Sequence, residues 1–209
     1  MKKLILYIVI ASSIITSQDQ LFVGTRPLGM GGAFIAVADD GNTITWNPAG
    51  LPRLRRKEFT SSYADLYAMD ITHSYTGIVW PFGDRIAVGF DWANVGFDDQ
   101  ELSYSENKLN FSIGYQPFKV FSIGGTFKYL SRDMGLDGTS YGKSTGIGYD
   151  IGLLISPHKK IRFGLGVYDL GGTNVTYKQN KVDEKLLGQA FKLGTVSYTH
   201  LRAHETNQD

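Results

Sequence analysis

Large apolar residues alternate with small or polar residues along most of the chain after residue 57. In residues 85–93, Phe90 and Trp92 fall on one face of an extended chain, and Gly89 and Asp91 fall on the other. A period of two is the signature of a β-strand whose two faces meet different surroundings. The pattern recurs clearly in residues 109–116, 121–129, 147–155 and 161–168, and more weakly in residues 58–66, 71–80 and 190–195. The sequence therefore predicts an all-β fold built from antiparallel hairpins.

The two faces of these strands suggest a membrane. Each run spans about 9 to 11 residues, the length that a tilted strand needs to cross a bilayer. One face is large and apolar, which suits lipid, and the other is small and polar, which suits a wet or plug-filled lumen. The isolated charges on the small face are Asp91, Lys128, Asp150 and Arg162. We therefore expect a transmembrane antiparallel β-barrel, while a soluble secreted β-protein, with the apolar face as its core, stays open.

The connections between the runs alternate in length. The short ones, with a proline each, are residues 81–84, 117–119 and 156–159, and the long ones are residues 94–108, 131–143 and 170–187. Outer-membrane barrels have short periplasmic turns and longer loops at the outer face. The sequence thus predicts that the proline-containing turns face the periplasm and that the long segments are external loops.

Residues 24–54 break the alternation and predict a compact plug ahead of the strands. Glycines surround Met30, a short apolar piece follows at residues 33–38, and residues 39–42 (DDGN) end it. We expect the small residues to let the plug backbone pack closely inside a lumen. A phosphate-binding loop is a weaker interpretation, because no strand precedes the glycines and no Lys-Ser/Thr pair follows them.

The plug sequence also resembles a known one. The strings LGMGGAF, VADDGN and WNPAGL, in this order, are similar to the N-terminal hatch of FadL-type outer-membrane transport proteins and of the related PorV/PorQ family. The resemblance implies that a FadL-like protein moves fatty-acid-like hydrophobic molecules, and that a PorV/PorQ-type factor docks secreted protein cargo in type IX secretion. The hatch residues that would line a ligand path are Gly29, Gly31, Gly32, Asn47, Pro48, Ala49 and Gly50.

The chain divides into four segments by this interpretation. Residues 1–17 have the charged, apolar and small regions of a signal peptide, which implies export across the inner membrane. Together with the barrel strands, this predicts a location in the outer membrane of a Gram-negative-type envelope. Residues 18–56 are the hatch, and residues 57–195 are barrel strands. Residues 196–209 resemble a translated sequencing adapter and are expected to be a non-native tail. FadL-like barrels have about fourteen strands, so we expect an incomplete, N-terminal half of a barrel.

Composition and charge exclude several classes of function. The aromatic share of 13% suits a β-rich protein with interfacial rings. The absence of cysteine excludes disulfides and thiolate metal sites, and a net charge of +1 argues against a nucleic-acid partner. No Gly-x-Ser-x-Gly elbow occurs, and Asp39 and Asp40 lack the calcium-loop register. We therefore expect no enzyme activity, cofactor or metal, and we expect the partners to be outer-membrane lipid and a hydrophobic small molecule or secreted protein cargo.

Overall fold

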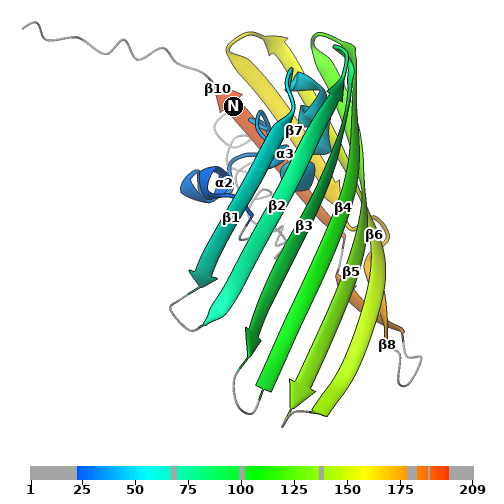
Figure 1. Cartoon of the computed structure of the whole chain (residues 1–209). Helices are drawn as coiled ribbons and strands as arrows, with labels where there is room; N and C mark the ends of the chain where they lie inside the picture. The colour runs from blue at the N-terminus through cyan, green and yellow to red at the C-terminus, as the bar shows by residue number, and fades with distance from the viewer. Residues whose placement is uncertain are drawn as a thin grey trace, which may run out of the picture.

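The computed structural model describes residues 23–66, 70–98, 102–136, 139–177, 183–187 and 189–197. These residues form a short helical plug followed by one antiparallel sheet (Figure 1). The predicted signal peptide, residues 1–17, and the tail from residue 198 onward lie outside the described residues. Both therefore stay predictions.

The sheet is a curved wall of ten strands. They are β1 (Glu58–Leu66), β2 (Ile71–Phe82), β3 (Ile86–Asp98), β4 (Leu102–Phe118), β5 (Phe121–Leu136), β6 (Thr139–His158), β7 (Ile161–Tyr168), β8 (Thr173–Tyr177), β9 (Asp183–Leu187) and β10 (Ala190–Ser197). Strands β1 to β7 pair in sequence order and β10 follows β7, while β8 pairs with β6 and β9. Among the described residues β1 and β10 do not pair, so the barrel is open. The predicted antiparallel β-barrel, incomplete and with an N-terminal plug, is confirmed as the fold.

The plug lies on the concave side of this wall (Figure 1). It contains α2 (Thr25–Gly29), α3 (Thr43–Trp46) and the 3₁₀ helix η1 (Pro48–Arg53). Every element is short because glycine, proline and the Asp-Asp-Gly-Asn break interrupt it. Among the described residues, no helix has the length and apolar character that a membrane span requires.

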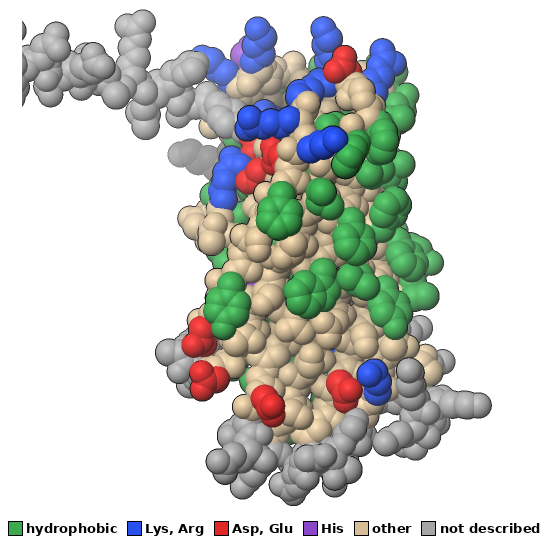
Figure 2. All heavy atoms as spheres, in the orientation of Figure 1, with side chains coloured by type: hydrophobic (Ala, Val, Ile, Leu, Met, Phe, Trp, Pro, Cys, Tyr) green, Lys and Arg blue, Asp and Glu red, His purple; other side chains and the backbone are tan. Residues whose placement is uncertain are grey.

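The convex face of the wall is apolar and exposed. Strand register lines up one large side chain from each of six strands in a continuous lateral row: Phe59, Ile78, Phe90, Phe111, Phe127 and Tyr149. Phe111 is 52% exposed and Tyr149 is also 52% exposed. Figure 2 shows apolar side chains as a belt across the wall. An exposed apolar face of this extent agrees with the pattern that the sequence predicts for a lipid-facing wall, and its contact with lipid stays a prediction.

The two ends of the wall differ in charge: Lys and Arg predominate at the end of the tight turns, and Asp and Glu predominate near the opposite end (Figure 2). The tight turns occupy residues 83–85, 119–120 and 159–160. Basic residues at that end are Arg55, Arg56, Lys57, Arg85, Lys119, Lys159 and Lys160. Acidic residues near the opposite end include Asp65, Asp70, Asp98 and Asp133.

The prediction that residues 94–108 and 131–143 form long external loops is wrong. Strand β3 continues to Asp98 and β4 begins at Leu102, while β5 continues to Leu136 and β6 begins at Thr139. The third segment, residues 170–187, contains β8 and β9. The ladder continues past the apolar belt because backbone pairing, once begun in a hairpin, does not need apolar side chains.

Polar cross-strand contacts hold these extensions together. The Arg132 guanidinium lies 2.5 Å from the Glu106 carboxylate, and Tyr104 donates a hydrogen bond of 2.6 Å to the same carboxylate. Trp92 Nε1 donates to Asn107 Oδ1 at 3.1 Å. Opposite charges and polar pairs facing each other across strands stabilise a sheet without apolar alternation. The asymmetry between the two ends therefore lies in strand length more than in loop length.

Replacing Phe111 by Lys should destabilise the protein in a bilayer. The change puts a charge in the middle of the lateral apolar row, which costs about 2–4 kcal/mol at the bilayer midplane. The measurement is the urea midpoint of folding into lipid vesicles. Ser103→Lys, on the same strand beyond the belt and paired with Asp98, is the control and should stay within about 0.5 kcal/mol. Equal losses in the two variants would show that the convex face does not lie in lipid.

Candidate functional site

A row of four glycines crosses the concave face of the wall. Gly114 on β4 pairs with Gly124 on β5, which pairs with Gly152 on β6, which pairs with Gly166 on β7. On the other side, Gly114 pairs with Ala87 on β3. These residues, here called the glycine row, form a shallow track across the strands, because no side chain larger than a methyl group rises from it.

The plug backbone lies directly in this track. A Cβ atom built on Gly124 would lie less than 3.0 Å from backbone atoms of Pro48 and Ala49. One built on Gly114 would come equally close to Pro48 and Pro52. Real Cβ atoms essentially never show such contacts, so these wall positions require glycine while η1 stays where it is.

Asn47 fixes the start of η1 to both the plug and the wall. Its side chain is fully buried, and its Nδ2 donates to the carbonyl of Ile35 at 2.8 Å and to the carbonyl of Leu153 on β6 at 3.2 Å. Its Oδ1 accepts from the backbone N–H of Ala49 at 3.1 Å, which caps η1. One side chain therefore satisfies three buried backbone groups that would otherwise be costly.

Further hydrogen bonds join the plug to the wall. Thr45 Oγ1 donates to Asp91 Oδ2 at 2.8 Å, and Asp91 Oδ1 also accepts from Asn110 Nδ2 at 2.8 Å. Tyr168 on β7 donates to the carbonyl of Trp46. Other contacts run from Ser112 Oγ to the carbonyl of Ile44 at 3.3 Å, from Arg162 to the carbonyl of Val37 at 3.0 Å, and from Arg53 to Ser156 Oγ at 2.8 Å.

Apolar packing completes the seat of the plug. Phe34 and Trp46 meet edge to face with ring centroids 6.3 Å apart, and both pack in a cluster with Leu154 on β6. Val196 on β10 packs against this cluster. Residue 196, the first of the predicted non-native tail, thus continues the strand, and the role of the tail stays a prediction.

The predicted site residues separate into two groups. Asn47, Pro48, Ala49 and Gly50 are buried, and a Cβ atom on Gly50 would collide with Ala38 and Thr43 inside the plug.

The glycine-rich lead-in behaves differently. Gly29 and Gly31 are exposed, with nothing within 4 Å of an added Cβ atom. Gly31 and Gly32 have φ of 62° and 78°, the left-handed region that favours glycine. The prediction that this lead-in packs closely is wrong. Its glycines shape a turn, and the glycines that contact the plug closely are those of the wall. The ligand path through both groups stays a prediction.

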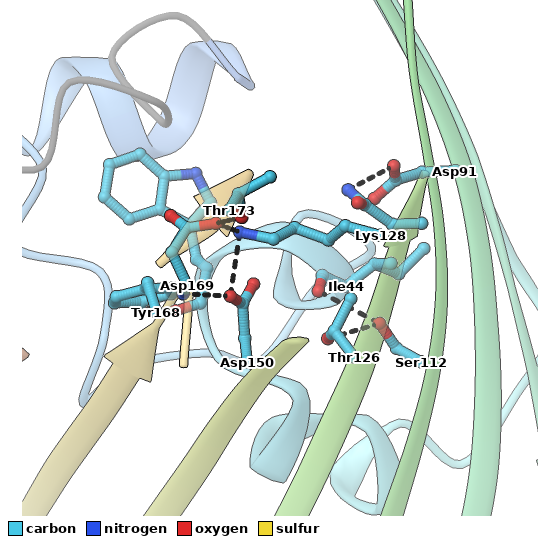
Figure 3. Close-up of polar contacts among 11 residues, drawn as sticks. Ile44, Asp91, Ser112, Thr126, Lys128, Asp150, Tyr168, Asp169 and Thr173 are labelled. Atoms are coloured by element: carbon cyan, nitrogen blue, oxygen red, sulfur yellow. Dashed lines mark hydrogen bonds and ion pairs between the residues drawn. The ribbon is translucent and has the colours of Figure 1, made fainter. Parts of the chain in front are cut away.

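A buried ion cluster lies in the lumen beside the plug (Figure 3). Lys128 reaches from β5 across Gly148, and its Nζ lies 2.8 Å from Asp150 Oδ1 and 2.5 Å from Asp169 Oδ1. Thr173 Oγ1 donates to Asp169 Oδ1 at 2.6 Å. The cluster ties β5 and β6 to the segment between β7 and β8. The strand pattern placed Lys128 and Asp150 on the lumen face, but only the fold shows that Asp169 joins them.

The acidic turn of the plug is paired rather than fully solvated. Arg26 Nη1 lies 2.7 Å from carboxylate oxygens of both Asp39 and Asp40. The hydrogen bond to Asp40 is the main cause that raises the pKa of Arg26 above its ordinary value. Asp40 also accepts from the Asn42 backbone at 2.9 Å. In the part of the chain that the structure describes, no group of three His, Cys, Asp or Glu side chains suits a metal ion.

Comparison with known proteins supports the fold. No protein-family model matches the chain, and no curated protein sequence matches it. Among solved structures, the chain is similar to the "CymD monoaromatic hydrocarbon channel", with 17% sequence identity and a TM-score of 0.57. The match covers 86% of this chain, which spans 61% of the length of that channel. Identity at this level shows the barrel fold alone. It supports the FadL-like fold and does not bear on PorV/PorQ in particular.

Replacing Gly124 by Ala should destabilise the seated plug. The new methyl group collides with the backbone of η1, and overpacking of this kind costs about 1–3 kcal/mol. The control is Gly125→Ala on the same strand, where the nearest atom to an added Cβ is 3.7 Å away. The thermal midpoint in detergent should fall for the first variant only. The same midpoint for both would mean that η1 does not occupy the glycine row.

Replacing Lys128 by Met should cost about 3–5 kcal/mol of unfolding free energy, because two buried carboxylates lose their cation. Adding Asp150→Asn and Asp169→Asn to that variant should recover part of the loss, since the uncompensated charges are then removed. Lys143→Met is the control: its side chain is 52% exposed and 3.6 Å from Asp133, so about 1 kcal/mol or less is expected. Denaturant titration measures all three. A loss no larger than the control's would contradict the buried cluster.

Proposed function

We propose that the chain is part of an outer-membrane channel for hydrophobic small molecules, and that the plug is its gate. The observation that carries this proposal is the way the plug is seated. It lies on a smooth row of glycines and is held to the wall by a small set of hydrogen bonds. At the glycine row η1 meets no wall side chain larger than a methyl group, so its displacement there unlocks no interdigitated side chains, although the packing of Phe34 and Trp46 with Leu154 must separate.

The surroundings of the plug support the same function. The convex apolar belt fits outer-membrane lipid and so supports a lumen that runs across the bilayer. The similar solved structure named above is a hydrocarbon channel by its description. Transport of this kind calls for neither a catalytic step nor a cofactor. The substrate remains a hydrophobic molecule of unassigned structure.

Asn47→Ala should increase uptake of a hydrophobic dye such as N-phenyl-1-naphthylamine in cells that express the full chain. The change removes the hydrogen bond to Leu153 on the wall, besides the one to Ile35 inside the plug. At about 1 kcal/mol for the bond to the wall, the displaced plug becomes about five-fold more populated. Gly31→Pro, which forbids the φ of 62° at that residue, should also alter uptake.

The matched control is Asn107→Ala, on β4 beyond the belt, where Asn107 accepts from Trp92. Membrane insertion is followed by fractionation and should be the same for all variants. Dye uptake that is unchanged in both Asn47→Ala and Gly31→Pro, with normal insertion, would contradict a gating plug.

A second function is favoured by the long strand extensions. Strands β3 to β6 continue beyond the apolar belt as polar hairpins, and such a surface suits docking of a secreted protein of the type IX kind. In that case the plug is a permanent seal. Co-purification from outer membranes distinguishes the two functions: recovery of a secreted protein that depends on these hairpins favours docking, and recovery of lipid alone counts against it.

A further inference from the structure

A pocket lies at the tight-turn end of the wall, away from the glycine row. Its volume is about 400 Å³, and it sits where the turns after β4 and β6 meet the end of η1. The residues that line it are Arg53, Lys119, Val120, Ser156, Pro157, His158, Lys159 and Arg162. Basic side chains dominate this lining, and no Asp or Glu is among the described residues that line it.

Two arginines form a fixed floor for this pocket. Arg53 donates to Ser156 Oγ at 2.8 Å, and Arg162 donates to the carbonyl of Val37 at 3.0 Å. Asp39 lies 3.6 Å from Arg162, so it offsets part of that charge. Because neutral oxygens hold both guanidinium groups in place, their positive charge is oriented in advance for an anion.

Two lysines stand at the rim, on the tips of the turns. Lys119 and Lys159 are exposed, and neither has an ion-pair partner within the described ranges. With the arginines below them, they surround one volume with positive charge from several directions. A phosphate group, which has several acceptor oxygens and carries negative charge, fits such a ring of donors. The basic end of the wall in Figure 2 adds to the same field.

The pocket also borders the lipid-facing surface. Val120 in its lining is 49% exposed, and the neighbouring Phe118 and Ile155 are 68% and 44% exposed. An anion with an apolar tail could therefore place its head in the pocket and its tail along the belt. Free phosphate carries the same charged group as the lipid head, but it has no tail to contact these apolar residues.

We propose that this pocket binds a phosphate-bearing anion, and that its apolar border selects the headgroup of a membrane lipid over free phosphate. The proposal goes beyond the gating function, because it concerns a different end of the wall and does not need the plug to move. It holds or fails independently of any transport measurement.

The test is lipid retention by the full chain in detergent, measured by native mass spectrometry. The probes are phosphatidylglycerol, a diacylglycerol with the same acyl chains and no phosphate, and inorganic phosphate. The variant is Lys119→Gln with Lys159→Gln, and the control is Lys143→Gln at the opposite end. Each lysine near the bound charge contributes about five-fold to affinity, so the double variant should lose about 25-fold. Thermal midpoints verify that both variants are folded.

Retention of phosphatidylglycerol over the diacylglycerol, weakened in the double variant and unchanged in the control, supports the lipid headgroup. Binding of inorganic phosphate with the same dependence on the lysines, and with no preference for phosphatidylglycerol, supports the phosphate pocket and rejects the lipid as its source. Equal binding of all probes, or equal binding by the double variant and the control, overturns the proposal.

Discussion

Backbone contact between the plug and the wall is the constraint on which the rest of this structure depends. Gly114, Gly124 and Gly152 stand side by side in the sheet, and a methyl group on any of them would come within 3.0 Å of plug atoms. Without side chains there, η1 lies against the strands themselves. The strand register must therefore align these glycines before the plug can seat, and this makes the wall and the plug one cooperative unit.

Polar groups in the lumen determine where the plug lies on the wall. A glycine row is smooth and by itself sets no unique place for the plug. Asn47 reaches the carbonyl of Leu153, and Thr45 reaches Asp91, so the plug is located along and across the strands. Buried polar groups are costly when unpaired, which makes these few contacts selective for one seat. Because few polar contacts hold the plug, it is suited to the gating proposed above.

The outer surface suits the proposed location of the wall in a membrane. The convex belt is apolar, the tight-turn end is basic, and the opposite end is extended and acidic (Figure 2). A basic rim next to an apolar belt matches the level at which lipid phosphates lie. The gate proposed inside the lumen and the anion pocket proposed at the rim therefore use different faces of one wall.

The sequence alone determined strands β1 to β7 and β10, their two faces and the existence of a plug, because a period of two and clusters of Gly and Pro are local signals. Residues 161–168 were predicted with the bounds that β7 has. The prediction from the sequence was wrong for residues 94–108, where polar cross-strand pairs extend the ladder. It was also wrong for Gly31, which shapes a turn and does not pack closely. Which glycines touch the plug, and that Asp169 meets Lys128, were decided by strand register and by contacts between residues far apart in the chain. Those depend on the assembled sheet, since no local pattern encodes which residue stands opposite another.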